Sequence, residues 1–197
     1  MSAERPRLYF DLGSPYAYLA VARAEAVLGT APELEPILLG AIFPLRGSGS
    51  WSQTDEREGR MADIESRAQR YGLPPIVWPA GWPVNGLAAM RAATWAKRQG
   101  RTHEFALAVF DQEFVHGRDI SEPATLRGAA LEAGLDPEQL ADAITSPELR
   151  SSSARPPTRR GRPGSAAFPR CGSAPPSTTE TISSSWPLRP ADERRLS

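Results

Sequence analysis

The sequence predicts an α/β fold in which an opening β-α-β unit is followed by an all-helical block. Three observations predict it. Within the first forty residues, two short β-prone segments flank an alanine-rich one. Residues 56–144 then place apolar side chains at helical spacing, with no strand pattern between them. After Arg150 about two thirds of the residues are Ser, Pro, Arg or Thr, a composition that favours disorder.

The first strand is predicted at Arg7–Asp11, which is short, aromatic and β-prone. The segment Leu12–Pro15 follows it as a strand-to-helix turn. Ser14 is a good N-cap, and Pro15 fits the first helical position because its missing N–H is not needed there. The sequence therefore predicts that a helix begins directly after this turn.

That helix is predicted over Tyr16–Leu28, which is alanine-rich and apolar at helical spacing, and Gly29 ends it. A second strand is predicted at Leu34–Leu39. Its apolar ending indicates a buried, parallel position, so the opening residues form a β-α-β unit.

The segment Gly40–Trp51 is predicted to be a loop, and several helices follow it. Ser121 and Asp136 are the predicted N-caps of the last two. The predicted helices are Glu56–Tyr71, Asn85–Gln99, Arg101–Val115, Glu122–Ala133 and Pro137–Ile144.

Composition limits the classes of function. Apolar residues make up 40% of the 197 residues and charged residues 23%, as in ordinary globular proteins. The formal net charge is zero, so nothing favours nucleic acid or an anionic membrane as a partner. No apolar run is long enough to span a bilayer, and the amino terminus has no apolar signal core. We therefore expect a cytoplasmic protein that acts on a small molecule.

Cysteine and histidine are scarce. The single cysteine, Cys171, excludes an internal disulfide, a Cys-x-x-Cys pair and a thiolate metal cluster. The two histidines, His103 and His116, lie far apart in the sequence and lack metal-ligand spacing. We therefore expect no metal centre.

Five blocks of sequence, in order, resemble a known family. The blocks are Tyr9–Leu19, Leu38–Phe43, Arg70–Pro75, Asn85–Ala92 and Gly117–Pro123. Together they resemble 2-hydroxychromene-2-carboxylate isomerases and kappa-class glutathione transferases, which have DsbA-like, thioredoxin-like folds. The resemblance covers Arg7 to Arg150. It implies that residues 1–45 are the β-α-β part of a thioredoxin-like domain, that 46–150 are a helical insertion domain, and that 151–197 are a disordered tail.

In the redox members of this fold the strand-to-helix turn carries Cys-x-x-Cys. Here Ser14-Pro15-Tyr16-Ala17 occupies it, so thiol–disulfide exchange at the turn is excluded. In the family this serine contacts the sulfur of glutathione, and the resemblance implies that Ser14 is catalytic and that Ser14, Pro15 and Tyr16 bind glutathione. A hydroxyl donor at the positive end of a helix stabilises a thiolate and lowers the pKa of the thiol.

Each of these residues also has a purely structural interpretation. Ser14 would only cap its helix. Tyr18, Asn85 and Arg91 are candidates for the substrate pocket. Packing is the favoured interpretation of Tyr16 and Tyr18, and a solvated helix face is an equal alternative for Arg91. These alternatives remain open at the level of sequence.

The resemblance implies a glutathione-dependent isomerase that acts on intermediates of aromatic catabolism. A cofactor thiolate would add to the conjugated double bond of the substrate, permit rotation and then be expelled. The alternatives are a kappa-like glutathione transferase and a truncated, non-enzymatic remnant. A homodimer is a further expectation, because relatives are commonly dimers.

The last 47 residues do not show the second half of a thioredoxin-like domain, which should contain a helix, a strand bearing a cis-proline, another strand and a closing helix. They carry eight arginines and three acidic residues. We hypothesise a frameshift near codon 150. Residues 167–173 can be encoded by GCG TTC CCA CGG TGC GGA TCG, and reading from the third base gives Val-Pro-Thr-Val-Arg-Ile. Val-Pro-Thr is the signature of the family's cis-proline strand.

Some positions of this alternate frame leave little freedom. Trp186-Pro187 forces an alanine codon, and Phe168-Pro169 permits only Pro or Ser. The alternative is a genuine disordered tail. On the frameshift hypothesis Cys171 is an accident of translation, and the chain lacks two of the family's four strands. We then expect weak folding and impaired activity.

Overall fold

The computed structural model of the chain describes residues 5–43, 47 and 49–152. Residues 1–158 form one of two units into which the chain divides, and all described residues lie in it. The predicted parts 1–45 and 46–150 therefore share one unit. The hypothesised frameshift product lies outside the described residues, except for Ser151 and Ser152 at the end of the last helix.

Two parallel strands, β1 (Arg7–Phe10) and β2 (Glu33–Pro36), form the sheet of the described residues. Leu8 pairs with Leu34, and Phe10 pairs with Pro36. This confirms the predicted parallel β-α-β start, which brings the carboxyl ends of both strands to one edge.

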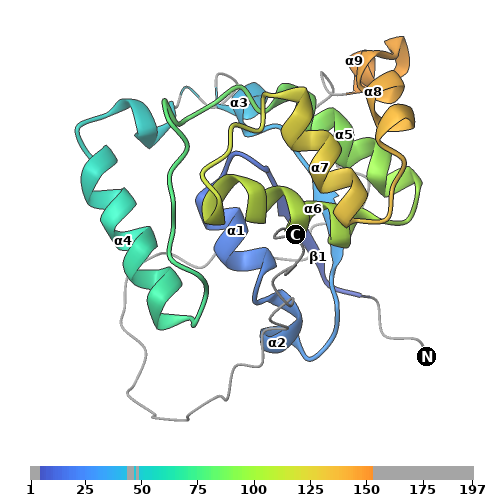
Figure 1. The fold of residues 1–197 in the computed structure, drawn as a ribbon. Helices are drawn as coiled ribbons and strands as arrows, with labels where there is room; N and C mark the ends of the chain where they lie inside the picture. Colours follow the sequence, from blue (N-terminus) through green and yellow to red (C-terminus); the bar gives the residue numbers. More distant parts are fainter. Residues whose placement is uncertain (1–4, 44–46, 48, 153–197) are drawn as a thin grey trace, which may run out of the picture. The chain divides into compact units, whose positions relative to one another are not determined.

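Helices make up the rest of the described fold (Figure 1). Their bounds are α1 (Pro15–Val21), α2 (Ala24–Leu28), α3 (Leu39–Ile42), the 3₁₀ turn η2 (Trp51–Gln53), α4 (Arg57–Arg70), α5 (Leu87–Arg98), α6 (Thr102–Phe110), the π-helical turn η3 (Asp111–Val115), α7 (Pro123–Glu132), α8 (Pro137–Thr145) and α9 (Pro147–Ser152).

The single helix predicted over Tyr16–Leu28 is two helices, because α1 ends at Val21 and α2 begins at Ala24. At the break the guanidinium of Arg23 lies over the ring of Tyr71, 3.5 Å from its centroid. This contact joins residues distant in sequence, so local periodicity could not reveal it. The predicted end at Gly29 is confirmed, with φ of +69°.

The second strand is shorter than predicted, since it ends at Pro36 and Leu39 already begins α3. The amide of Leu39 donates to the side chain of Asp11, at 2.7 Å, instead of continuing the sheet. Part of the predicted loop Gly40–Trp51 is therefore helical, in α3.

Two of the three predicted caps are confirmed. The Ser14 hydroxyl accepts from the amide of Ala17 at 3.4 Å, and Asp136 accepts from the amides of Glu138 and Gln139. The prediction for Ser121 is wrong. Glu122 is the N-cap residue of α7, because Pro123 takes the first helical position directly after it.

An aromatic core joins β1, α1, α6 and η3. Phe10 meets Phe110 edge to face, with ring centroids 6.3 Å apart, and Tyr18 contacts Phe110 and Phe114 at 5.8 Å and 5.7 Å. All four side chains are buried. Such pairs stabilise by about 0.5–1.5 kcal/mol beyond the area they bury, so this cluster holds the first strand against the helices.

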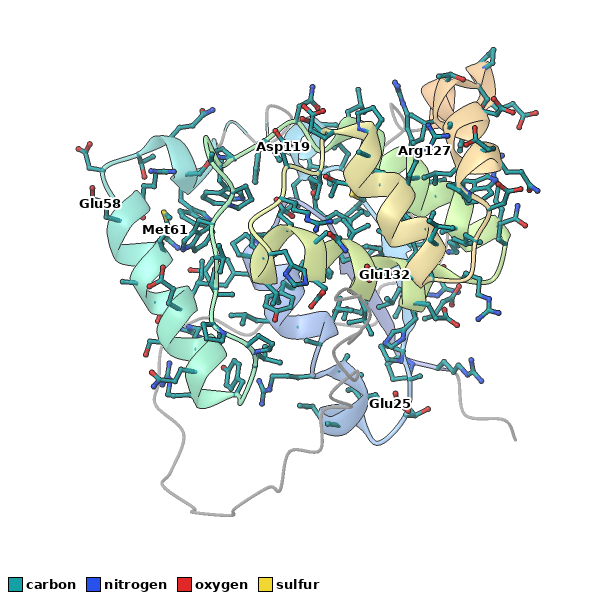
Figure 2. The ribbon with its side chains drawn as sticks, viewed as in Figure 1. Glu25, Glu58, Met61, Asp119, Arg127 and Glu132 are labelled. Carbon is teal, nitrogen blue, oxygen red and sulfur yellow. The ribbon has the colours of Figure 1, made fainter. Side chains whose placement is uncertain are left out.

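The remaining helices pack on one another through small residues. Ala89, Ala92, Ala93 and Ala96 of α5 are fully buried, and α5 contacts α6, α8 and α9. Arg127 of α7 pairs with Glu138 of α8 on the outer surface (Figure 2).

Candidate functional site

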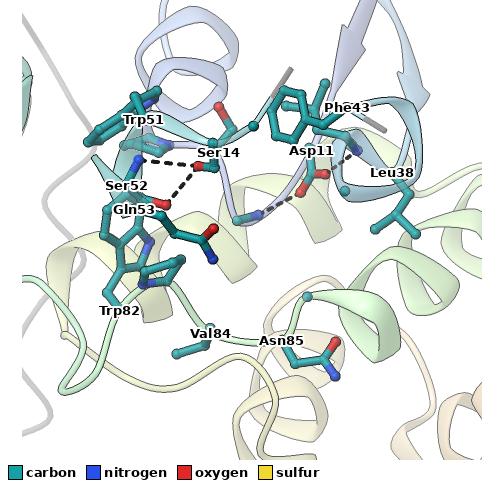
Figure 3. Close-up of a pocket in the computed structure, with 18 of the residues that line it drawn as sticks. Asp11, Ser14, Leu38, Phe43, Trp51, Ser52, Gln53, Trp82, Val84 and Asn85 are labelled. Carbon is teal, nitrogen blue, oxygen red and sulfur yellow. Dashed lines mark hydrogen bonds between the residues drawn. The ribbon is translucent and has the colours of Figure 1, made fainter. Parts of the chain in front are cut away.

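A pocket of about 590 Å³ lies where the carboxyl ends of both strands meet the amino end of α5 (Figure 3). Four separate segments contribute its walls: the turn after β1, the α3 segment, the η2 segment and the loop before α5. Its lining residues are Asp11, Gly13, Ser14, Pro15, Leu38, Leu39, Gly40, Phe43, Gly49, Ser50, Trp51, Ser52, Gln53, Trp82, Pro83, Val84, Asn85, Gly86 and Leu87.

Ser14 lines this pocket from the N-cap position of α1. Its hydroxyl oxygen accepts the amide of Ala17, and among the described residues its hydroxyl proton is donated to no partner. Since a hydroxyl both donates and accepts, capping leaves the proton available for a ligand atom in the pocket. Capping and ligand binding by Ser14 are therefore compatible.

Asp11 is a buried carboxyl group on the pocket wall, only 8% exposed. One oxygen accepts the amide of Gly13 at 2.9 Å and the other accepts the amide of Leu39 at 2.7 Å, as the dashed lines in Figure 3 show. Burial raises the pKa of Asp11, and the two backbone hydrogen bonds act against this rise. Asp11 thereby fastens the turn before Ser14 to the opposite wall at α3.

Aromatic rings form the wall on the η2 side. Trp51 and Trp82 both line the pocket, with ring centroids 5.4 Å apart. Trp82 is 4% exposed and its indole N–H has no partner among the described residues. Arg57 donates to the carbonyl oxygen of Trp82 at 2.7 Å, which ties α4 to this wall. The wall offers flat apolar surface to the pocket.

Neutral polar groups complete the lining. The hydroxyls of Ser50 and Ser52 are hydrogen-bonded to each other at 2.7 Å, and Gln53 extends toward the middle of the pocket (Figure 3). The side-chain oxygen Oδ1 of Asn85 accepts the backbone amide of Leu87. The NH₂ group of the same side chain therefore remains for other partners. Among the residues that the structure describes, Asp11 is the one charged side chain in the lining.

The structure brings some of the predicted site residues together and not others. Ser14, Pro15 and Asn85 line the pocket. Tyr16 does not, because its ring packs edge to face against Trp51, 6.0 Å between centroids, from behind the wall. It follows that Tyr16 supports the pocket rather than facing a ligand.

Tyr18 and Arg91 are placed away from this pocket. Tyr18 faces the core between Phe110 and Phe114, one helical turn beyond Ser14, and burial raises the pKa of its hydroxyl to about 12. Its packing interpretation is the one the structure supports. Arg91 is half-buried on α5, with its Nε unpartnered among the described residues, and it does not line the pocket.

Sequence reasoning missed much of the pocket wall. Leu38, Phe43, Trp51 and Gln53 lie in or beside a segment interpreted only as a strand end and a loop. The carboxylate of Asp11 at the end of the first strand was a sequence signal for this wall. A buried carboxylate needs hydrogen-bond donors, so a neighbouring segment had to supply amides to it. Which amides it would find depended on the tertiary fold.

The sequence also matches a known protein family. Residues 7–155 match the DSBA-like thioredoxin domain family, which is most of the chain. The chain belongs to this family. The predicted family resemblance and the thioredoxin-like fold class are thus confirmed, whereas the hypothesised frameshift stays a prediction.

Among curated proteins, the 2-hydroxychromene-2-carboxylate isomerase of Sphingobium xenophagum is 28% identical over 145 residues, covering 71% of this chain and 73% of that protein. A solved 2-hydroxychromene-2-carboxylate isomerase has a similar fold, with a TM-score of 0.63 at 20% identity over 75% of this chain and 74% of the other. A probable DsbA oxidoreductase from Streptomyces coelicolor has a TM-score of 0.54 at 17% identity, covering 75% and 70%.

None of the described helices combines the length and the apolar character that a membrane crossing requires.

Proposed function

We propose that this chain is an isomerase of the 2-hydroxychromene-2-carboxylate type that uses glutathione bound at Ser14. The observation that carries the proposal is the position of Ser14, which lines a pocket at the carboxyl ends of the strands and whose hydroxyl donates to no partner among the described residues. The curated relative with this activity supports the reaction class. The serine in place of a cysteine supports a borrowed thiol, because the turn has none of its own.

The residues of the pocket fit a peptide thiol. When bound, glutathione supplies the thiolate nucleophile that the turn lacks. The Ser14 hydroxyl would donate to the sulfur and favour its ionised form. The unused NH₂ group of Asn85 and the side chain of Gln53 are suited to peptide carbonyl and carboxylate oxygens.

The aromatic wall fits the proposed substrate class. Trp51 and Trp82 present flat rings to the pocket, against which a chromene-like ring system would pack. Walls of this kind exclude water from the reacting atoms.

The experiment replaces Ser14 by alanine. Losing a hydrogen bond to a charged sulfur costs about 1.5–3 kcal/mol, so Ser14→Ala should lower the glutathione-dependent isomerisation rate by about 10- to 100-fold. Isomerisation is followed by absorbance with and without glutathione. Asp136→Ala is the matched control, since it removes a helix cap at about the same cost in stability but lies on α8, away from the pocket.

The proposal fails if wild-type activity does not depend on glutathione, or if Ser14→Ala and Asp136→Ala lose activity equally. Conjugation of glutathione to an electrophilic substrate, without isomerisation, would instead identify the chain as a kappa-like transferase.

We further propose that activity in this chain is impaired. The sheet of the described residues has two strands, and the Val-Pro-Thr hypothesised for the alternate frame would fall across residues 167–170, outside them. On this proposal the glutathione site is missing the part that the other frame encodes.

A further inference from the structure

Glu113 is a fully buried carboxyl group with no hydrogen-bond partner on either oxygen among the described residues. It belongs to η3, where the amide of His116 donates to the carbonyl of Asp111, five residues earlier, at 3.0 Å. Such π-helical turns are rare and frequently occur at functional sites. Gln112, Glu113 and Phe114 are buried in succession, which a regular surface helix would not do.

The charges that act on Glu113 come from two other segments, and both are negative. They are Asp11, on the turn after β1, and Asp119, in the loop after η3. Ile120, next to Asp119, lies against Gly86 of the pocket lining. On η3 itself, Asp111 pairs with His116 at the surface. Glu113 is therefore a buried carboxyl outside the pocket lining, on which the wall residue Asp11 acts electrostatically.

Ionising both carboxyl groups would be costly, because within the described part of the chain no cation acts on either of them to offset the removal of charge from water. The two groups differ in how they are bound. Asp11 accepts two backbone N–H groups, which favour its charged form, whereas Glu113 accepts none. Burial and the neighbouring carboxylates raise the pKa of Glu113 well above its ordinary value.

We propose that Asp11 and Glu113 form a carboxyl pair holding one proton, on Glu113, and that the charged Asp11 positions the Ser14 turn against Leu39. The role in ligand binding rests on the proposed function of Ser14. Neither carboxyl touches a reacting atom in this proposal, so both are positioning residues. Ionisation of Glu113 would add a second charge to that of Asp11 and alter the acidity of any thiol held at Ser14.

A thiol placed at position 14 reports on the pair without glutathione or substrate. The parent for the test is the full chain carrying Ser14→Cys and Cys171→Ser, so that one thiol remains. The rate of its alkylation by iodoacetamide is measured across the pH range in which thiols ionise. The carbonyl stretch of protonated carboxyl groups is recorded in parallel by infrared spectroscopy.

In the parent, the infrared band of a buried protonated carboxyl is expected. Glu113→Gln should remove this band, together with any ionisation in the alkylation profile that does not belong to the thiol. Asp11→Asn should lower the thiol pKa by about one unit, because it removes the adjacent negative charge. Glu58→Gln, at an exposed site on α4 (Figure 2), is the matched control and should change neither readout.

An unchanged alkylation profile and infrared band in Glu113→Gln would overturn the carboxyl pair. An unchanged thiol pKa in Asp11→Asn would overturn the role of its charge. If Glu113→Gln folds poorly, Glu113→Leu serves the same purpose. Leucine is also neutral, and its apolar side chain needs no hydrogen-bond partner when buried. Because the thiol is built into the chain, a failure of glutathione binding at Ser14 leaves this test unaffected.

Discussion

The carboxyl group of Glu113 links the stability of the fold to pH. Its pKa is raised well above 4.5 in the folded chain by burial and by the charges of Asp11 and Asp119. Below pH 4.5 the folded and unfolded states are both protonated at this position. As the pH rises above 4.5, the unfolded state loses the proton first, so the free energy of unfolding falls. The fall continues until the pH passes the folded pKa.

Glu113→Gln should therefore be more stable than wild type at neutral pH, with little difference in acid. The gap should widen by at most about 1.4 kcal/mol for each pH unit above 4.5. Urea unfolding of both chains at a series of pH values measures it. A constant gap across the series would show that Glu113 is ionised in the folded chain, contrary to this prediction.

At the scale of elements, η3 is locked to the loop before α5 by a close approach. The amide of Val77 donates to the carbonyl of Phe114 at 2.8 Å, and Gly117 follows with φ of +63°. A Cβ at Gly117 would lie 2.8 Å from a methyl carbon of Val77. This junction carries Phe114 into the core and leads to the aromatic wall at Trp82.

Gly117→Ala should destabilise the chain by about 1–3 kcal/mol from backbone strain, with an added cost for the collision with Val77. Gly134→Ala is the matched control, since its φ of +71° imposes similar strain but nothing lies within 4 Å of its Cβ. Thermal unfolding compares the two. Equal losses would mean that the approach of Val77 to Gly117 contributes nothing.

At the scale of the whole molecule, the expectation concerns the reading frame after codon 150. A chain translated in the alternate frame should regain Val-Pro-Thr at positions near 167–170 and with it the second half of the sheet. We predict a higher melting temperature and at least about tenfold faster glutathione-dependent isomerisation, which corresponds to about 1.4 kcal/mol.

Sequencing of the coding DNA tests whether the reading frame shifts near codon 150. Parallel assays of the two chains then compare their melting temperatures and isomerisation rates. Coding DNA that lacks Val-Pro-Thr in the alternate frame would exclude the frameshift. Equal melting temperatures and rates would show that the residues after 150 do not limit the fold or the activity.

Much of the secondary structure followed from local rules. The Ser14 cap with Pro15 after it and the end at Gly29 are predictable, since each depends on the chemistry of one residue and its neighbours. The break at Arg23 was not, because the contact made there, with the ring of Tyr71, joins residues far apart in the sequence. The π-helical turn was not either, since it is stabilised by the packing of Phe114 and the Val77 hydrogen bond.

Some features of the site were likewise predictable from the sequence, and others depended on the tertiary fold. By itself the sequence determined the family, the parallel β-α-β start, and a serine turn without a thiol, because these depend on residues adjacent in the chain. Only the tertiary structure decided which side chains face the pocket. It turned Tyr18 into the core, brought Trp51 and Trp82 together, and buried Glu113 where the charge of Asp11 acts on it. The physical reason is that burial and the pairing of buried polar groups depend on segments that meet only when the chain folds.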